Sequence, residues 1–450
     1  MTLSGARLKR RLGRYDVALI VIGSVIGSGI FRTPAVVAQR AHVPAIALAA
    51  WVAGGVVALC GAFVLGELGA RRPGDCGVYA HLRDAFHPIV GFAYGWGALL
   101  AALSGGLAAA AILFSGYVLS LTGLAVAPGV IAAITLGILA LVNALGVRQG
   151  ATIQNLLTLL KLGALLALVV AGLTARPATV ATLPPFAASS LGPVGALGAF
   201  SVAMIPVLFS YLGAQVANFM TAETKDAAQT LPLGLTVGMV GVAIIYVLVN
   251  AACIRVLGVV GLARSDVPVA AVLAHAAGPL ATRLTAIAIA LTTLGFMSNR
   301  MLTVPRLYHA MAADALFFRA VAWVNPRTHV PVVAVALQAV VAIVIALSSG
   351  YAHILNFVVA ISYAFGGLLA LALFIFRGRD TKAGAPRFDG FRAPWHPYST
   401  VLFMLASWSV AIATCIAYPR DGLTGIAVVL SSVPAYFIFT RFGFAKRVAA

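Results

Sequence analysis

An apolar segment that is interrupted in its middle opens the chain. Residues 17–39 read VALIVIGSVIGSGIFRTPAVVAQ, which is long enough to cross a lipid bilayer as a helix. Gly27, Ser28 and Gly29 interrupt this segment. Inside a bilayer, an unwound stretch of backbone survives only where protein or a polar cavity supplies hydrogen-bond partners. The interruption therefore predicts a polar binding site within the membrane.

Two half-helices that meet at such a gap expose backbone groups of opposite polarity. Free amides at the start of the second half attract a carboxylate, and free carbonyl groups at the end of the first half attract an ammonium group. We interpret the segment as the substrate site of a secondary transporter for a small zwitterion. A second interpretation stays open at this point, because Gly23 and Gly27 form a GxxxG pair that would let an unbroken helix pack closely on its neighbours.

Apolar runs continue over nearly all 450 residues. Hydrophobic residues make up 62% of the chain and charged residues 9%, and the mean hydropathy is +1.04. These values exclude an ordinary soluble domain and indicate one polytopic membrane domain. We predict twelve membrane-spanning helices, at residues 15–40, 43–69, 88–120, 125–146, 151–174, 195–219, 232–259, 278–309, 329–349, 353–376, 398–418 and 422–440.

We interpret the excess of Lys and Arg residues as an indication of which loops face the cytoplasm. A net charge of +19 would suggest a nucleic-acid partner in a soluble protein. When the loops are assigned to alternate sides, however, most of the 30 Lys and Arg residues fall on the side of the N-terminus. The positive-inside rule then places both termini in the cytoplasm. We expect a multi-pass protein of a bacterial inner membrane, in contact with lipid and with no nucleic acid.

The twelve predicted spans form two groups of five and a final pair. The first helix of the second group is also interrupted, around Pro206, Ser210 and Gly213. Interrupted helices at corresponding positions of two halves are typical of inverted-repeat transporters with a site at the bilayer midplane. The predicted fold is an all-α integral membrane protein, a LeuT-type 5+5 inverted repeat with broken helices 1 and 6. Its segments are a cytoplasmic N-terminal tail (1–14), helices 1–5 (15–174), an extracellular connection (175–194), helices 6–10 (195–376), a cytoplasmic loop (377–397), helices 11 and 12 (398–441) and a cytoplasmic tail (442–450).

Lys161 is the charged residue that lies deepest in a predicted span. It follows about ten residues of helix 5, too far from the membrane surface for its ammonium group to reach water easily. An ionisable group at this depth is costly and by default faces the bundle interior in a functional role. We identify Lys161 as a candidate gating or coupling residue.

Neither an enzyme nor a metal protein is predicted. The eight histidines are dispersed, with no HxxxH or HExxH spacing. A channel would require a ring of repeated filter residues, and no such repeat is present in the sequence. We expect no catalytic residue, no metal site and no cofactor. The four cysteines show no CxxC spacing and are read as small apolar side chains: Cys60, Cys76, Cys253 and Cys415.

Four motifs, in order along the chain, resemble the APC superfamily of amino acid, polyamine and organocation permeases, and its bacterial L-type and cationic amino acid transporter-like members in particular. Residues 73–79 (PGDCGVY) are similar to the Pro-x-Gly-Gly-x-Tyr loop of that family, with Asp75-Cys76 as a departure. Residues 91–96 match its Gly-Phe-x-x-Gly-Trp start of helix 3. Residues 209–213 (FSYLG) and the stretch from Asn299 to Asp314 match two later motifs.

The resemblance assigns roles to residues at the two interruptions. The carbonyl groups of Val25, Phe209 and Leu212 would receive the α-ammonium group of the substrate, and the Phe209 ring would close over it. The amides around Ser28 and Gly29, with the Ser28 hydroxyl, would receive the α-carboxylate. The candidate substrate-binding residues are Val25, Ile26, Gly27, Ser28, Gly29, Phe209, Ser210, Leu212 and Gly213.

The resemblance also bears on coupling and on partners. In sodium-independent relatives, a lysine at the position of Lys161 stands where sodium-coupled members bind a sodium ion. Lys161 would then tether helix 5 to the unwound part of helix 1, and sodium coupling is not expected. By analogy with the family, association with a heavy-chain subunit is possible. The external cysteine expected before helix 4 is absent, however, so we expect no obligatory heavy-chain subunit and a monomer or homodimer.

The charge around the interruptions favours one substrate class. No acidic residue lies near either interruption, and Lys161 would repel a second cation at close range. The charge therefore favours neutral L-amino acids as substrates. Together with what the resemblance implies, this predicts a sodium-independent exchanger or proton-coupled transporter that moves them by alternating access. The alternative is a cationic amino acid or polyamine antiporter.

Overall fold

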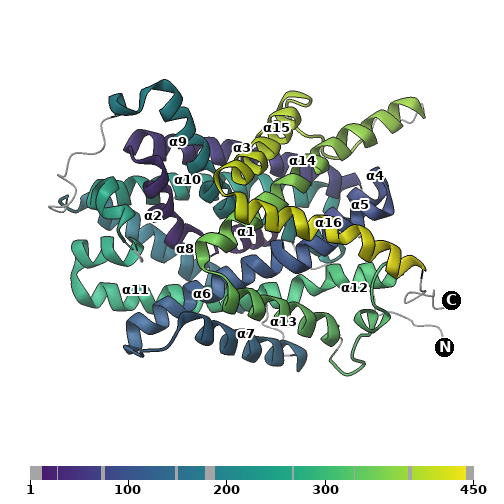
Figure 1. Cartoon of the computed structure of the whole chain (residues 1–450), viewed down its shortest axis with the longest axis horizontal. Helices are drawn as coiled ribbons and strands as arrows, with labels where there is room; N and C mark the ends of the chain where they lie inside the picture. The colour runs from purple at the N-terminus through teal and green to yellow at the C-terminus, as the bar shows by residue number, and fades with distance from the viewer. Residues whose placement is uncertain are drawn as a thin grey trace.

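A computed structural model describes residues 13–27, 29–71, 77–146, 151–177, 188–265, 268–328, 330–383 and 388–441. These residues form a bundle of α-helices with short 3₁₀ and π stretches, and they contain no β-strand. Figure 1 shows α1 near the middle of the bundle and α7 along its lower edge.

The first half of the chain contributes nine helical elements. Their bounds are α1 (Arg14–Val25), α2 (Gly29–Ala41), α3 (Pro44–Arg71), α4 (Val78–Ala85), α5 (Pro88–Gly97), the π-helix η1 (Ala98–Ala102), α6 (Leu103–Thr122), α7 (Pro128–Ala144) and α8 (Ala151–Thr174). Because α5, η1 and α6 follow one another without a gap, they form one apolar span from Pro88 to Thr122.

The second half contributes ten more. Their bounds are α9 (Ala188–Tyr211), the 3₁₀-helix η3 (Ala214–Glu223), α10 (Ala227–Ala263), α11 (Pro268–Thr303), α12 (Pro305–Ala313), the 3₁₀-helix η4 (Arg319–Ala322), α13 (Val332–Ser348), α14 (Tyr351–Lys382), α15 (Tyr398–Ala417) and α16 (Pro419–Arg441). Glycines with positive φ bend α9 at Gly192, α10 at Gly258 and α11 at Gly278. These bends lie within three residues of the predicted span limits at 195, 259 and 278.

The helices have the length and composition of membrane spans. In the described part of the chain, nine helices are long and apolar enough to cross a bilayer, and the pair α1 and α2 would make a tenth. The helices α7 and α13 occupy the fourth and ninth predicted spans, but each has only 17 residues, which is the lower limit for a crossing. The structure therefore supports a multi-pass membrane protein, and the count of twelve spans remains a prediction.

The outer surface of the bundle is apolar, as contact with lipid requires. Exposed large side chains follow one another along the outer helices, for example Ile134, Ile138 and Leu141 on α7 and Leu405 and Ile412 on α15. Polar backbone groups along these helices are paired within the helix, so such a face needs no further hydrogen-bond partner in hydrocarbon.

Both predicted interruptions are present. The helix α1 ends at Val25 and α2 begins at Gly29, with a bend of 47° between them. The helix α9 ends at Tyr211, and η3 starts after a turn at Leu212 and Gly213. The unbroken GxxxG helix considered for residues 17–39 is therefore wrong.

The start of α1 is held by a local cap. The Asp16 carboxylate accepts a hydrogen bond of 2.9 Å from the Gly13 amide. A carboxylate in the first turn satisfies a free donor and interacts favourably with the helix dipole.

Candidate functional site

The two interrupted helices meet at their breaks. A Cβ atom added to Gly29 would lie 2.6 Å from Ser210 Oγ and 2.8 Å from Ser210 Cα. A Cβ atom added to Gly213 would lie only 2.4 Å from the carbonyl oxygen of Ser24. Glycine at both positions therefore lets the two backbones touch.

A buried tyrosine joins the two breaks. The Tyr246 side chain of α10 is fully buried, and its hydroxyl oxygen lies 3.1 Å from the carbonyl oxygens of both Val25 and Ser210. The hydroxyl donates its single hydrogen between these two acceptors. Tyr246 thus links the end of α1 to the end of α9.

The carbonyl groups at the end of α1 all have partners. A helix leaves its last four carbonyl groups without partners inside the helix, and in an apolar bundle each unpaired group is costly. The donors are the Lys161 ammonium group to Gly23 (3.2 Å) and to Ile26, the Arg300 guanidinium group to Ser24 (3.3 Å) and the Tyr246 hydroxyl to Val25 (3.1 Å).

Lys161 makes the contact that the family resemblance implied. Its side chain on α8 is 3% exposed and bonds to the end of α1 through two carbonyl groups. A cation at the carbonyl end of a helix is also favoured by the helix dipole. The tether from predicted helix 5 to the unwound part of helix 1 is therefore present, and a role in coupling remains a prediction.

A second buried cation faces the same place. Arg300 of α11 is 8% exposed, and both it and Lys161 lie against the ring of Phe296, at 5.0 and 5.8 Å from its centre. The same ring lies where a Cβ atom on Gly27 would be, at 2.9 Å. Phe296 and the two cations together surround the end of α1.

A cavity opens between the two breaks. It contains about 460 Å³ of space, including the part open to solvent. Its lining is Val25, Gly27, Gly29, Ala102, Leu103, Gly106, Phe209, Ser210, Leu212, Gln215, Phe296, Arg300, Val358 and Ser362.

Most of the predicted binding residues are at this cavity. Six of them line it, namely Val25, Gly27, Gly29, Phe209, Ser210 and Leu212. Two others, Ile26 and Gly213, do not line it but are next to lining residues in the chain. Ser28 lies outside the described residues.

The carbonyl group of Val25 is already occupied. It accepts a hydrogen bond of 2.7 Å from the Gly27 amide besides the one from Tyr246, so both of its lone pairs are used. Among the described residues, the Phe209 carbonyl accepts one bond, from the Leu212 amide at 3.2 Å, which leaves one of its two lone pairs for a ligand. Of the predicted ammonium receptors, Phe209 is therefore better placed than Val25.

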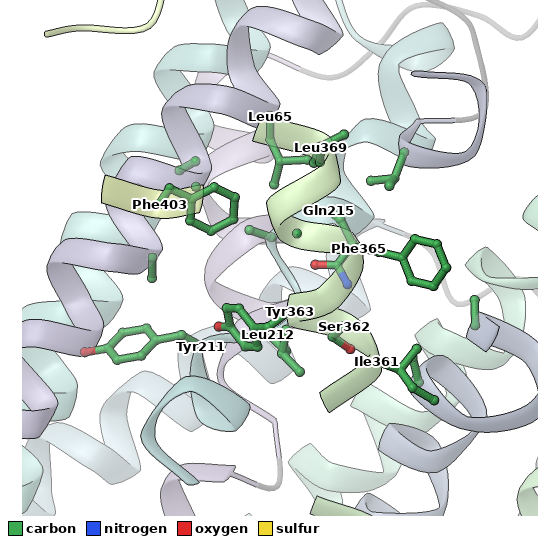
Figure 2. A pocket seen from close by; sticks show the side chains of 18 of the residues that line it. Leu65, Tyr211, Leu212, Gln215, Ile361, Ser362, Tyr363, Phe365, Leu369 and Phe403 are labelled. Atoms are coloured by element: carbon green, nitrogen blue, oxygen red, sulfur yellow. The ribbon is translucent and has the colours of Figure 1, made fainter. Parts of the chain in front are cut away.

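A larger pocket adjoins the cavity. Figure 2 shows this pocket, in which the Gln215 amide and the Ser362 hydroxyl lie among apolar side chains. Both residues, with Ala102, Leu103 and Leu212, also line the cavity between the breaks. The two spaces therefore share a wall, and the larger one provides about 780 Å³, including open solvent.

Phe209, the predicted aromatic lid, packs against another aromatic ring. Phe209 is buried and packs edge-on against Tyr351 of α14, with ring centres 6.1 Å apart. The Arg32 guanidinium lies over the Tyr351 ring, 5.2 Å from its centre. Of these three residues, Phe209 lines the cavity.

A polar cluster follows the loop motif outside the spans. The Tyr79 hydroxyl donates to Asp314 at 2.9 Å, and Arg83 also pairs with Asp314. Burial and the neighbouring Asp314 carboxylate raise the pKa of Tyr79 above its usual value, so the hydroxyl remains protonated. The cluster connects α4 to the end of α12. Residues 73–76 of the motif lie outside the described residues.

Three residues of the site were not predicted. Arg300 carried a signal, because it is a cation inside a predicted span, next to Asn299 of a family-like motif. The sequence gives no indication of a role for Tyr246 or Phe296, since an aromatic residue in an apolar helix is usually part of the core.

The Tyr246 bridge can be tested directly. Tyr246→Phe removes the donor between two buried carbonyl groups, which is expected to cost about 1–3 kcal/mol of stability. We expect a lower midpoint of thermal unfolding in detergent and slower transport by the reconstituted protein. Tyr398→Phe is the matched control, because Tyr398 is 81% exposed. Equal unfolding midpoints for the two variants would show that the bridge contributes nothing.

A buried cavity where two interrupted helices meet inside an apolar bundle is the arrangement of a secondary transporter. A sequence description of the amino acid permease family matches residues 12–443. The chain therefore belongs to the amino acid permease family, which confirms the APC resemblance, and it is a membrane transporter and not an enzyme.

Individual relatives cover almost the whole chain. It is 26% identical over 452 residues to the serine/threonine exchanger SteT of Bacillus subtilis, with 98% of each chain aligned. It is 26% identical over 450 residues to the b(0,+)-type amino acid transporter 1 of Homo sapiens, aligning 98% of this chain and 91% of the relative. It is 26% identical over 442 residues to the large neutral amino acids transporter small subunit 2 of Homo sapiens, aligning 96% and 81%.

Proposed function

We propose that this protein is a sodium-independent exchanger of L-amino acids that works by alternating access. The observation that carries the proposal is the contact of two interrupted helices around a buried cavity. Backbone groups freed by the interruptions suit the two charged groups that all amino acids share. The names of the relatives, two transporters and an exchanger of amino acids, support the same function.

In the proposed binding mode, α2 and the turn after α9 each bind one charged group of the substrate. The amides at the start of α2, at Gly29, receive the α-carboxylate, together with Ser28. The carbonyl groups of Phe209 and Leu212 receive the α-ammonium group. Phe209, which packs edge-on against Tyr351, closes the cavity during transport.

Sodium independence rests on Lys161. Its ammonium group bonds to two carbonyl groups at the end of α1, and such carbonyl groups could otherwise coordinate an ion. A fixed cation at this place repels a second one at close range. The exchange that we propose therefore proceeds equally well in sodium and in choline salts.

The charge of the cavity excludes one group of substrates. Arg300 lines it, and no acidic residue is among the described residues that do. A cationic side chain would meet Arg300 and Lys161 with no carboxylate between them. We therefore propose substrates without a positively charged side chain, a condition that the predicted neutral amino acids meet.

The remaining parts of the proposal concern architecture and location. We propose twelve spans in a 5+5 inverted repeat, both termini in the cytoplasm and a bacterial inner membrane. We also propose that the chain acts without a heavy-chain subunit, as a monomer or homodimer. The short external connection from Gly123 to Ala127 carries no cysteine that could join such a subunit.

Counterflow in liposomes tests the function. The purified chain is reconstituted with one unlabelled amino acid inside, and the uptake of labelled amino acid is measured. We expect uptake when an amino acid without a cationic side chain is inside, in sodium and in choline alike. Uptake driven only by arginine, ornithine or putrescine would favour the cationic antiporter. A requirement for sodium would contradict the proposed role of Lys161.

A further inference from the structure

Arg300 places a permanent positive charge at the wall of the cavity. Its guanidinium is protonated at any physiological pH. Within the described residues, its one hydrogen bond goes to the Ser24 carbonyl at 3.3 Å, and its buried Nε–H group has no partner there. A guanidinium group has five N–H donors, so most of its bonding capacity is left for a ligand.

Among the described residues that line the cavity, no acidic side chain balances this charge. The lining residues that the structure describes include no Asp or Glu. Lys161 lies 5.8 Å from the centre of the same Phe296 ring and adds a second cation. A buried charge without a counter-charge is costly. The carbonyl end of α1 offsets only part of that cost, because a helix end carries about half a charge.

A zwitterionic substrate does not supply the missing charge, because its α-groups cancel. A substrate with a second carboxylate does, since it enters the cavity with a net charge of about −1 at neutral pH. Its two carboxylates can also be separated, one at the amides of Gly29 and one at the planar fork of Arg300, which matches a carboxylate in geometry.

We infer that Arg300 is a specificity-determining residue that makes the cavity prefer amino acids with a side-chain carboxylate over their neutral counterparts. The inference rests on the proposed function and narrows it. Among amino acids without a cationic side chain, aspartate and glutamate are the better substrates, and neutral amino acids are the weaker ones.

The structure offers a competing role for Arg300, which is to cap the Ser24 carbonyl and nothing more. That role would support every substrate equally, because it acts on the shape of the break. A carboxylate-selective role acts only on substrates that carry the second carboxylate. The two roles are separated by comparing glutamate with glutamine, since these side chains have almost the same size and differ in charge.

The test uses the full chain in liposomes, with counterflow driven by glutamate or by glutamine over a range of concentrations. For the unchanged protein we expect an apparent KM for glutamate about tenfold or more below that for glutamine. In Arg300→Gln we expect the KM for glutamate to rise by about 10- to 100-fold, as for the loss of a charge-assisted hydrogen bond. The KM for glutamine is expected to change by less than about threefold.

Two further variants complete the test. Arg300→Lys keeps the charge and should recover part of the glutamate preference. Arg283→Gln is the matched control, because Arg283 is an exposed residue of the same helix α11, and it should leave both KM values unchanged.

Several outcomes would overturn the inference. Equal losses for glutamate and glutamine in Arg300→Gln would reduce Arg300 to a cap of Ser24. A lower KM for glutamine in the unchanged protein would contradict the preference, and this comparison stands even if Arg300→Gln does not fold. Exchange of glutamine without any exchange of glutamate would leave the proposed function intact and end the inference. If no amino acid drives exchange, both fail.

Discussion

Replacing Lys161 with alanine is expected to reduce the rate of amino acid exchange by tenfold or more. The substitution leaves the carbonyl groups of Gly23 and Ile26 buried without the donor that they have now. Each unsatisfied buried group costs about 1–3 kcal/mol, so the end of α1 is expected to shift toward other partners. The break between α1 and α2 would then no longer present the geometry that binds substrate.

The fold itself should survive this change. Lys161→Ala also removes one of two cations that lie against the Phe296 ring, which relieves repulsion with Arg300. We therefore expect a normal yield and a single peak in size-exclusion chromatography, and a rate loss in liposome counterflow.

The control for this variant is Lys382→Ala, since Lys382 is an exposed residue in the last turn of α14. It should exchange amino acids at the rate of the unchanged protein. If Lys161→Ala also does so, its bonds to α1 are structural only and Lys161 has no part in transport. A variant that aggregates would show that the tether is needed for folding, which contradicts the expected normal yield.

The interruptions were predictable because they contrast with their surroundings. Within an apolar run, the sequence Gly27-Ser28-Gly29 has no role in a regular helix, and the membrane restricts what an unwound stretch can be. The break near Gly213 followed from the same contrast and from its position in the second group of helices. Lys161 was found for the same reason, as a charge where none is expected.

The partners of these residues were not predictable in the same way. The carbonyl groups at the end of α1 are bonded from α8, α10 and α11, which follow α1 by more than a hundred residues. Hydropathy shows that a cation is buried but not which carbonyl group it meets. The role of Tyr246 depends wholly on where α10 packs, and no feature of the surrounding apolar sequence separates it from a core tyrosine.

The span count shows a further limit of sequence reasoning. Residues 125–146 and 329–349 were assigned as spans from their apolar composition, and the structure forms the shorter helices α7 and α13 there. Composition gives the length of an apolar run, whereas local backbone geometry sets the limits of the helix. The helix α7 begins only at Pro128, and α13 ends where Ser349 leaves helical geometry. Whether 17 residues cross a bilayer depends on tilt and local thickness.

Replacing Gly213 with alanine is expected to abolish exchange almost completely, with a loss of about a hundredfold or more. Two independent costs add. The φ angle of Gly213 is +138°, a conformation that side chains rarely adopt, and strain of this kind costs about 1–3 kcal/mol. A Cβ atom would also lie 2.4 Å from the Ser24 carbonyl oxygen and 2.9 Å from the Arg300 guanidinium. The first neighbour is backbone and cannot turn away, so the two breaks must separate.

Two other glycines supply graded controls. The three atoms nearest to a Cβ atom on Gly27 would all belong to the ring of Phe296, the closest at 2.9 Å. A side chain can rotate, so Gly27→Ala should lose less activity. A Cβ atom on the exposed Gly163 of α8 would meet nothing within 4 Å. Gly163→Ala should keep full activity and gain up to about 1 kcal/mol of helix stability.

The order of the three rates, measured in liposome counterflow at equal protein content, is the decisive result. We expect Gly163→Ala to be the fastest, Gly27→Ala intermediate and Gly213→Ala the slowest. If Gly213→Ala exchanges as fast as Gly163→Ala, the close contact between the end of α1 and the turn after α9 is not required for transport. The proposed substrate site between the breaks would then be contradicted, because it depends on the two breaks lying in contact.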